Sequence, residues 1–264
     1  GDASFRKFYR LILNKTSKII VLTNKEKYRN LIAYSAVNKF LRSKKQLTTC
    51  NETVELPDGD FIDLAWTDIP KENETRPIVV VLHGLEGSVN SHYAKGMLSA
   101  IKEKEWLGVL MHFRGCSGRI NRKARSYHSG DTEDISYLSK FLKQKYPQLP
   151  MTVIGFSLGG NALLKWLGEQ SDNVNLFAAS AVSVPFVLSE CATKLDNGFS
   201  MVYRKNLIDE LKDYMRIKQT HLEKKGKQEE VSKINQCGDM SKIKSFWQYD
   251  DQVVAKLHGF SGVN

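Results

Sequence analysis

Residues 151–166 read MTVIGFSLGGNALLKW, and the rest of the chain is organised around this stretch. Its first four residues are apolar or β-branched, which is typical of a buried strand. They lead directly into the pentapeptide GFSLG at residues 155–159, and a helix-forming segment over residues 160–169 follows at once. A strand, a Gly-x-Ser-x-Gly turn and a helix predict a nucleophile elbow, whose tight turn forces Ser157 into a strained backbone conformation. Ser157 is therefore the candidate catalytic nucleophile.

The composition indicates a globular protein of the α/β class. The chain has 264 residues, of which 41% are hydrophobic and 26% charged, so it is long enough for one large domain and is not fibrous or disordered. Its net charge of +10 would suit an acidic partner such as nucleic acid or an anionic membrane. The lysines and arginines are spread among acidic residues without an aromatic-interleaved basic motif, so we expect a solvated basic surface and no nucleic-acid partner.

The cysteines and the N-terminal sequence indicate in which cellular compartment the protein is found. The four cysteines Cys50, Cys116, Cys191 and Cys237 are far apart, with no Cys-x-x-Cys pair and no histidine at ligand spacing. Free thiols in a reducing compartment are favoured, and neither a metal nor a cofactor is expected, because the elbow chemistry needs neither. The most apolar N-terminal stretch, residues 11–22, contains lysines and is too short to span a bilayer. We expect a cytoplasmic protein, with peripheral membrane contact as an open alternative.

Three segments follow one another along the chain, and the first is a basic N-terminal arm over residues 1–52. Apolar residues recur at helical spacing, as at Phe5, Tyr9 and Ile12 and again between Ile32 and Leu41. This spacing predicts amphipathic helices within residues 1–48. A membrane-surface role for the arm is a second interpretation.

The second segment, residues 53–186, has the pattern of an α/β core. Period-two alternation on both sides of the turn at residues 57–60 predicts a hairpin, and the apolar run at residues 77–82 predicts a strand buried on both faces. Beyond it we expect helices and strands in alternation, namely helix 90–105, strand 106–113, helix 131–146, strand 150–155 and, after the helix behind Ser157, strand 175–185. Such alternation implies a mostly parallel sheet flanked by helices, with the site at the carboxyl ends of the strands.

The loop after the strand at residues 77–82 reads HGLEGS, residues 83–88. In an elbow architecture this loop supplies one backbone N–H of the oxyanion hole, and the residue after the nucleophile supplies the other. Leu85 and Leu158 are therefore the candidates, through their main-chain N–H groups. We expect His83, at the strand end, to hold the loop by hydrogen bonds and not to act as a base.

Four ordered blocks resemble one family. They are HGLEGS, then FRGCSG with YHSGDTEDI, then GFSLGGNALLKWLGE, and finally QYDDQVVAKLHGF. Together they resemble the YheT-like branch of the α/β-hydrolases, which is related to eukaryotic abhydrolase-domain lipid esterases and to yeast medium-chain ethanol acyltransferases. The resemblance covers residues 54–260. It implies an α/β-hydrolase fold with a helical cap and a serine hydrolase acting on carboxylic esters or thioesters, often of medium-chain acyl groups, with Ser157 as nucleophile.

Two departures from the family pattern stand out. An Asn-Pro-His-x-Gln signature associated with the family is not present between residues 28 and 45. The family's triad order is serine, acid, histidine, with the last two on loops after two further strands. The third segment, residues 187–264, instead predicts a helical cap, with helices at residues 207–218 and 220–233. We therefore expect a chain truncated before the final strands, with the acid and histidine of the triad outside it.

Some acids and histidines that are present have the order of a triad. Asp196 with His221 is one such pair, and Asp250 or Asp251 with His258 is another. We expect each to be solvated or structural, because no supporting strand accompanies it. For His128, in the YHSGD block, we expect a role in fixing the turn before a helix.

Three functional hypotheses follow. The first is a serine esterase or acyltransferase acting on a small ester or thioester of short or medium acyl length, with lipid esters included. The second is an inactive truncated hydrolase or pseudoenzyme. The third is a basic membrane- or nucleic-acid-binding protein on a hydrolase scaffold. The sequence gives no indication of the oligomeric state.

Overall fold

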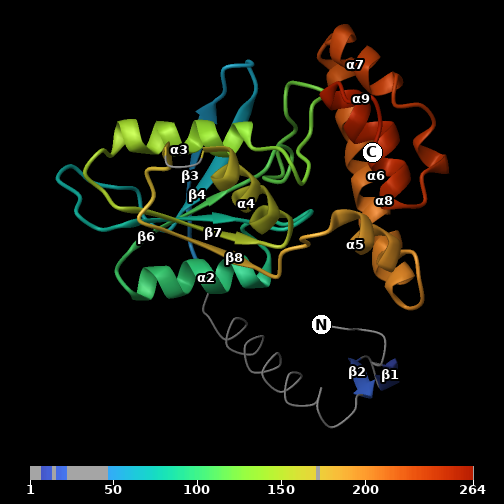
Figure 1. Cartoon of the computed structure of the whole chain (residues 1–264), viewed down its shortest axis with the longest axis horizontal. Helices are drawn as coiled ribbons and strands as arrows, with labels where there is room; N and C mark the ends of the chain where they lie inside the picture. Colours follow the sequence, from blue (N-terminus) through green and yellow to red (C-terminus); the bar gives the residue numbers. More distant parts are fainter. Residues whose placement is uncertain (1–6, 14–15, 23–46, 171–172, 264) are drawn as a thin grey trace. The chain divides into compact units, whose positions relative to one another are not determined.

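The computed structural model describes residues 7–13, 16–22, 47–170 and 173–263, in two units, Gly1–Gln46 and Leu47–Asn264 (Figure 1). In the first unit, strands β1 (Lys7–Leu13) and β2 (Thr16–Leu22) pair antiparallel. The helical prediction is wrong for these two segments, because both are rich in aromatic and β-branched residues, which favour strands, and two residues between them suffice for a hairpin. The helix expected between Ile32 and Leu41 lies outside the described residues.

The second unit is built on a six-stranded sheet in the order β3-β4-β6-β5-β7-β8. Its strands are β3 (Cys50–Glu55), β4 (Phe61–Trp66), β5 (Ile78–Leu82), β6 (Leu107–Met111), β7 (Met151–Phe156) and β8 (Ala178–Val182). The pairs among β6, β5, β7 and β8 are parallel, while β3 with β4 and β4 with β6 are antiparallel. The predicted hairpin and the mostly parallel sheet are thus confirmed, and the carboxyl ends of β5, β6 and β7 meet at one edge.

Helices cover both faces of this sheet. Helix α2 (His92–Glu103) lies on one face, and α3 (Glu133–Lys145) with α4 (Leu158–Gln170) lies on the other (Figure 1). Strand β5 contributes to both layers, because Ile78, Val80 and Leu82 belong to the cluster under α3 and α4 while Val79 and Val81 pack under α2. This two-sided burial explains the continuous apolar run at residues 77–82.

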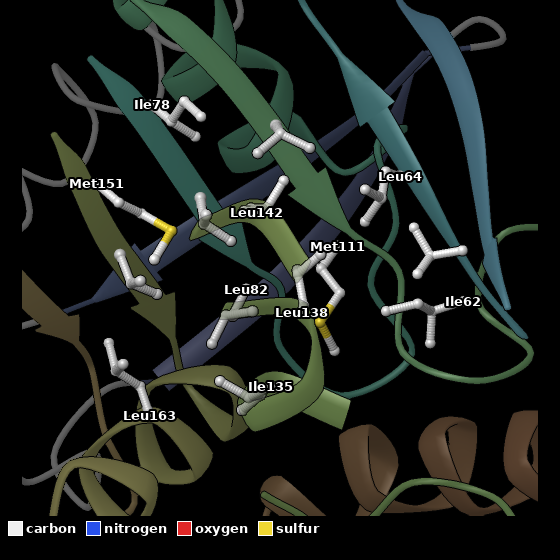
Figure 2. Packing of buried hydrophobic residues seen from close by; sticks show 14 of the residues in the cluster. Ile62, Leu64, Ile78, Leu82, Met111, Ile135, Leu138, Leu142, Met151 and Leu163 are labelled. Carbon is white, nitrogen blue, oxygen red and sulfur yellow. The ribbon is translucent and has the colours of Figure 1, made fainter. Parts of the chain in front are cut away.

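The larger core lies between the sheet and α3 with α4. Figure 2 shows Leu82 and Met111 from the sheet facing Ile135 and Leu138 of α3, with Leu163 of α4 beside them. These side chains come from four separate segments of sequence, and Leu82, Leu138 and Met111 are at most 2% exposed. A core of this kind contributes most of the favourable free energy of folding.

The cap follows β8 and has a core of its own. Its helices are α5 (Leu188–Leu195), α6 (Ser200–Lys224), α7 (Gln228–Asn235), α8 (Phe246–Tyr249) and α9 (Ala255–His258). Helix α6 runs unbroken through residues 218–220, so the predicted break between two helices there is wrong, and the chain turns instead at Gly226, whose φ of 68° suits glycine. The predicted helical character of the cap is confirmed. None of the helices in the described ranges has the length and apolarity needed to cross a membrane.

A buried ion-pair network fixes the loop after β6. Arg114, whose side chain is 2% exposed, donates from Nε and Nη2 to the two carboxylate oxygens of Asp134 at 2.8 and 2.7 Å. Its Nη1 also donates to Asp58 Oδ2 at 2.6 Å. The pKa of Asp58 is lowered, because these hydrogen bonds and the guanidinium charge outweigh its partial burial. The network joins the β3–β4 hairpin, the β6 loop and the start of α3.

Replacing Arg114 by leucine is expected to lower the free energy of unfolding by about 3–5 kcal/mol, because Asp134 would be left buried without its partner. Urea denaturation followed by circular dichroism measures this change. The matched control is Arg216→Leu, since Arg216 pairs with Asp213 and both side chains are more than half exposed, at 55% and 64%. The Arg216→Leu substitution should lower the free energy of unfolding by less than about 1 kcal/mol. Equal losses of unfolding free energy in the two variants would show that the Arg114 network does not stabilise the fold more than a surface ion pair does.

Candidate functional site

Ser157 stands at the junction of β7 and α4 with a φ of 51°, in the left-handed region that few non-glycine residues adopt. Its backbone N–H donates to Val182 O at 2.8 Å, and its carbonyl accepts from Asn161 N at 3.0 Å. These bonds tie the turn to β8 on one side and to the first turn of α4 on the other. Its side chain is exposed, while Gly155 and Gly159 on either side are buried.

The glycines around Ser157 allow backbones to approach more closely than any side chain would. A Cβ atom at Gly159 would lie 2.4 Å from the carbonyl oxygen of His83, and one at Gly155 would lie 2.5 Å from the carbonyl oxygen of Gly159. Both contacts are with rigid backbone atoms, so only glycine fits. The start of α4 is thereby pressed against the carboxyl end of β5.

His83 holds the loop that follows β5. Its Nδ1–H donates to Gly84 O at 2.7 Å, and its Nε2 accepts from Phe113 N at 3.0 Å. Burial lowers the pKa of His83 to about 3, so the ring is neutral at physiological pH. The predicted loop-holding contacts are present, and with both ring nitrogens engaged His83 has no lone pair to offer as a base.

Tyr127 supports the same loop from the other side, and sequence reasoning did not identify it. Its hydroxyl accepts from Glu86 N at 2.8 Å and donates to Glu86 Oε1 at 2.7 Å. Gly84 N donates in turn to the hydroxyl of Tyr93 at 2.8 Å. The only signal in the sequence was the position of Tyr127 beside His128 in the YHSGD block.

Leu85 and Leu158 are the residues whose backbone N–H groups were predicted to form an oxyanion hole. Both residues line one cavity together with Ser157. The neighbouring N–H groups of Gly84, Glu86, Gly87 and Ser157 all have acceptors. Within the described ranges, no acceptor is assigned to the N–H of Leu85 or of Leu158. An oxyanion hole requires N–H donors that are free to bind a substrate oxygen, so the role of Leu85 and Leu158 stays a prediction that these observations permit.

The cavity has a volume of ≈ 200 Å³ and lies between the core and the cap. Its walls are mainly apolar and aromatic side chains: Leu85, Tyr127, Leu158, Pro185, Leu188, Leu195, Tyr203, Leu207, Leu211, Phe246, Tyr249 and Val254. A wider hollow of ≈ 770 Å³ along α5 shares Cys191 and Leu195 with this cavity, but Ser157 does not line it, so the smaller cavity is the candidate site. The smaller cavity suits an apolar group bound next to Ser157.

Two of the histidines considered above, His128 and His258, lie close to this cavity. His128 lines it, and Nδ1 of its ring accepts from Gly130 N at 3.1 Å, which is the turn-fixing contact expected for it. His258 Nε2 donates to Ser126 O at 2.9 Å. Burial is the main cause that lowers the pKa of each to about 4. No hydrogen bond connects Ser157 Oγ with a histidine anywhere in the described part of the chain.

The two acids Asp250 and Asp196 lie in different surroundings, since only Asp250 lines the cavity. Asp250 lines the cavity, and burial raises the pKa of its carboxyl to about 6. Asp196 is paired with Arg204 at 2.6 Å, and His221 lines a separate hollow on α6 beside Ile217. The structure therefore does not bring Asp196 and His221 to Ser157. Asp250 reaches the cavity because the cap packs against the loop that contains Ala124 and Arg125, which the sequence alone did not indicate.

Comparison with known proteins identifies a family model and several relatives of the alpha/beta hydrolase class. Residues 77–254 match the family model described as alpha/beta hydrolase fold. YheT of Escherichia coli (strain K12), a protein named as a candidate esterase, is 37% identical over 234 residues, which are 89% of this chain and 67% of that protein. An abhydrolase domain-containing protein of Dictyostelium discoideum is 27% identical, over 82% of this chain and 54% of its own length.

Phospholipase ABHD3 of Homo sapiens is 30% identical over 162 residues. That match spans 60% of this chain and 40% of the human protein. The chain thus spans between 40% and 67% of the length of these three relatives.

Gly159→Ala is expected to lower the free energy of unfolding by at least about 2–3 kcal/mol, because the added methyl group has no room against His83 O and overpacking strains the backbone. The matched control in the same helix is Gly168→Ala, where an added Cβ would meet nothing within 4 Å. That control should raise stability by about 0.5–1 kcal/mol through helix propensity. Thermal and urea denaturation would distinguish the two. Similar effects at both positions would show that α4 is not pressed against β5.

Proposed function

Because the chain belongs to the α/β-hydrolase superfamily, in its YheT-like branch, we propose that it is a carboxylic ester hydrolase with Ser157 as nucleophile. The observation that carries the proposal is the position of Ser157. It is exposed on a strained turn and lines a mainly apolar cavity together with Leu85 and Leu158. The names of the relatives, which include a phospholipase, support the same class of reaction.

The proposed reaction proceeds through an acyl-enzyme. Ser157 Oγ attacks the carbonyl carbon of the ester while a general base takes its proton, and the negative oxygen accepts from the N–H groups of Leu85 and Leu158. No histidine among the described residues is assigned as this base. The C–O bond to the alcohol then breaks, and the base returns the proton to the leaving alcohol. Water attacks the acyl group in the same way, which releases the carboxylic acid and regenerates Ser157. A second alcohol in place of water would give acyl transfer.

The cavity indicates the kind of acyl group. Its walls are mainly apolar, so each buried methylene contributes about 0.8 kcal/mol to binding. Its volume of ≈ 200 Å³ is below the range of about 300–1,000 Å³ that holds a drug-sized ligand. We infer a short or medium acyl chain on a small ester or thioester, and lipid esters are included when the remainder of the molecule stays outside the cavity.

A specific observation favours a second candidate, a hydrolase-fold protein without catalysis. Ser157 Oγ has no hydrogen bond to a histidine among the residues that the structure describes, and serine without a base is a weak nucleophile. The oxyanion hole and binding alone leave about 10³–10⁴-fold acceleration over water in a comparable triad. The two candidates therefore differ in the rate at which Ser157 reacts.

Labelling with a fluorophosphonate probe, followed by intact mass, distinguishes these candidates. We expect one label per chain, attached to Ser157 and absent from the Ser157→Ala variant. Ser129→Ala is the control, because Ser129 lines the same cavity but has no role in the reaction proposed, so it should label as the parent does. His128→Ala should change the labelling rate by less than about twofold, since His128 makes no hydrogen bond to Ser157. No labelling of a folded protein would favour the non-catalytic candidate.

The dependence on acyl length gives a separate prediction. Across p-nitrophenyl esters from acetate upward, kcat/KM should rise by about fourfold per methylene and should fall at palmitate, because the cavity is then full. Leu207→Trp would occupy part of the cavity, so it should shift the optimum to shorter chains. Ile217→Trp is the control on the same helix, since Ile217 is 57% exposed. A profile that does not vary with acyl length would contradict acyl binding in this cavity.

A further inference from the structure

Three potential metal ligands meet where the cap joins the core. His128 and Asp131 lie on the loop between β6 and α3, and His258 is the last residue of α9. One ligand atom from each lies within 4.8 Å of the other two. The rings of His128 and His258 are in edge-to-face contact, with centroids 4.4 Å apart. Two imidazoles and a carboxylate are thus gathered from positions as far as 130 residues apart in sequence.

One carboxylate oxygen of Asp131, in the cluster of His128, Asp131 and His258, is buried without a hydrogen-bond donor. The residue is 5% exposed. Its Oδ1 accepts from Arg125 Nη2 at 2.8 Å, but its Oδ2 is buried without a hydrogen bond. A buried carboxylate oxygen without a donor is unfavourable, and such an atom in a native structure calls for an explanation. A bound cation beside Oδ2 would provide the missing interaction.

His258 already has the tautomer of a metal ligand, whereas His128 would have to change its tautomer. His258 donates from Nε2 to Ser126 O at 2.9 Å, so the neutral ring carries its lone pair on Nδ1. A ligand histidine whose other nitrogen donates to a backbone carbonyl is the usual arrangement around metal ions. His128 could bind through Nε2 if its proton moved to Nδ1, at the cost of the 3.1 Å bond from Gly130 N.

Nearby positive charges are already compensated. Arg125 pairs with Asp131 and also donates to Glu133 Oε2 at 2.6 Å. Lys165, the next cation that acts on His128, pairs with Glu169. The fixed charges around the cluster therefore do not exclude a divalent cation.

We propose that His128, Asp131 and His258 bind a divalent cation of the zinc class, which fastens α9 of the cap to the loop that precedes α3. Imidazole nitrogens with one carboxylate suit zinc, whereas calcium and magnesium prefer oxygen ligands alone. Ligands of a tetrahedral zinc ion are about 3.4 Å apart, so small side-chain rotations from the present separations would complete the site. The fourth position is left to water. The proposal does not depend on catalysis by Ser157.

Cobalt(II) and zinc titrations of the full chain, after treatment with a chelator, test this site. We expect one equivalent of cobalt to bind and to give tetrahedral absorption bands in the visible range, and zinc to displace it. Zinc at about a hundred times its Kd should raise Tm by about 5 °C or more. Magnesium or calcium should give neither effect. Absence of the bands, or an equal rise in Tm with magnesium, would overturn the proposal.

Variants separate binding at this cluster from binding elsewhere. His128→Ala and His258→Ala should each abolish the cobalt bands and the zinc-dependent rise in Tm. His92→Ala is the matched control, because His92 is exposed on α2 and belongs to no cluster of ligands in the described part. Circular dichroism of the metal-free variants confirms that they fold. If a folded His128→Ala or His258→Ala protein binds cobalt as the parent does, or if His92→Ala loses binding, the site is not the one proposed.

Discussion

The backbone contact between the start of α4 and the end of β5 is the constraint on which the rest of the site depends. Because Gly159 has no Cβ, α4 can begin directly against the carbonyl oxygen of His83. Ser157 must then turn within a single residue, which requires its φ of 51°. The same contact brings Leu158 and Leu85 to one cavity. A residue keeps a strained backbone conformation only where the surrounding structure holds it in place. Here the parallel sheet holds Ser157.

Around this contact, hydrogen bonds position the loops after β5 and β6, which the strands of the sheet do not hold by themselves. His83 reaches Phe113 on the loop after β6, and Tyr127 reaches Glu86 on the loop after β5. Arg114 joins the β6 loop to α3 through Asp134. Each of these groups is fully or largely buried, so its hydrogen bonds are strong and their loss is costly. The loops at the carboxyl edge are thus held to one another as well as to their own strands.

Local pattern was sufficient for much of the fold. The strand at residues 77–82 and the turn at Ser157 follow from short, unambiguous stretches. The oxyanion-hole role of Leu85, inferred from the loop after that strand, and that of Leu158, inferred from the turn, stay predictions. The strands β1 and β2 were missed, because seven-residue apolar segments with interspersed lysines fit helical and strand periods alike. The cavity walls and the cluster of His128 with His258 could not be predicted, since they depend on how the cap packs across more than a hundred residues of sequence.

The loop at residues 121–131 is where cap, core and cavity meet. Lys218 of α6 is fully buried and donates to Ala124 O at 3.0 Å and to Arg125 O at 2.7 Å, and burial lowers its pKa to about 7. Two and three residues after Arg125, the same loop places Tyr127 and His128 in the cavity wall. Leu85 packs against both the core cluster and the cap cluster. Since these contacts share one short segment, a shift of α6 or α9 cannot leave the walls around Ser157 unchanged, and the shape of the cavity is set by the cap as much as by the sheet.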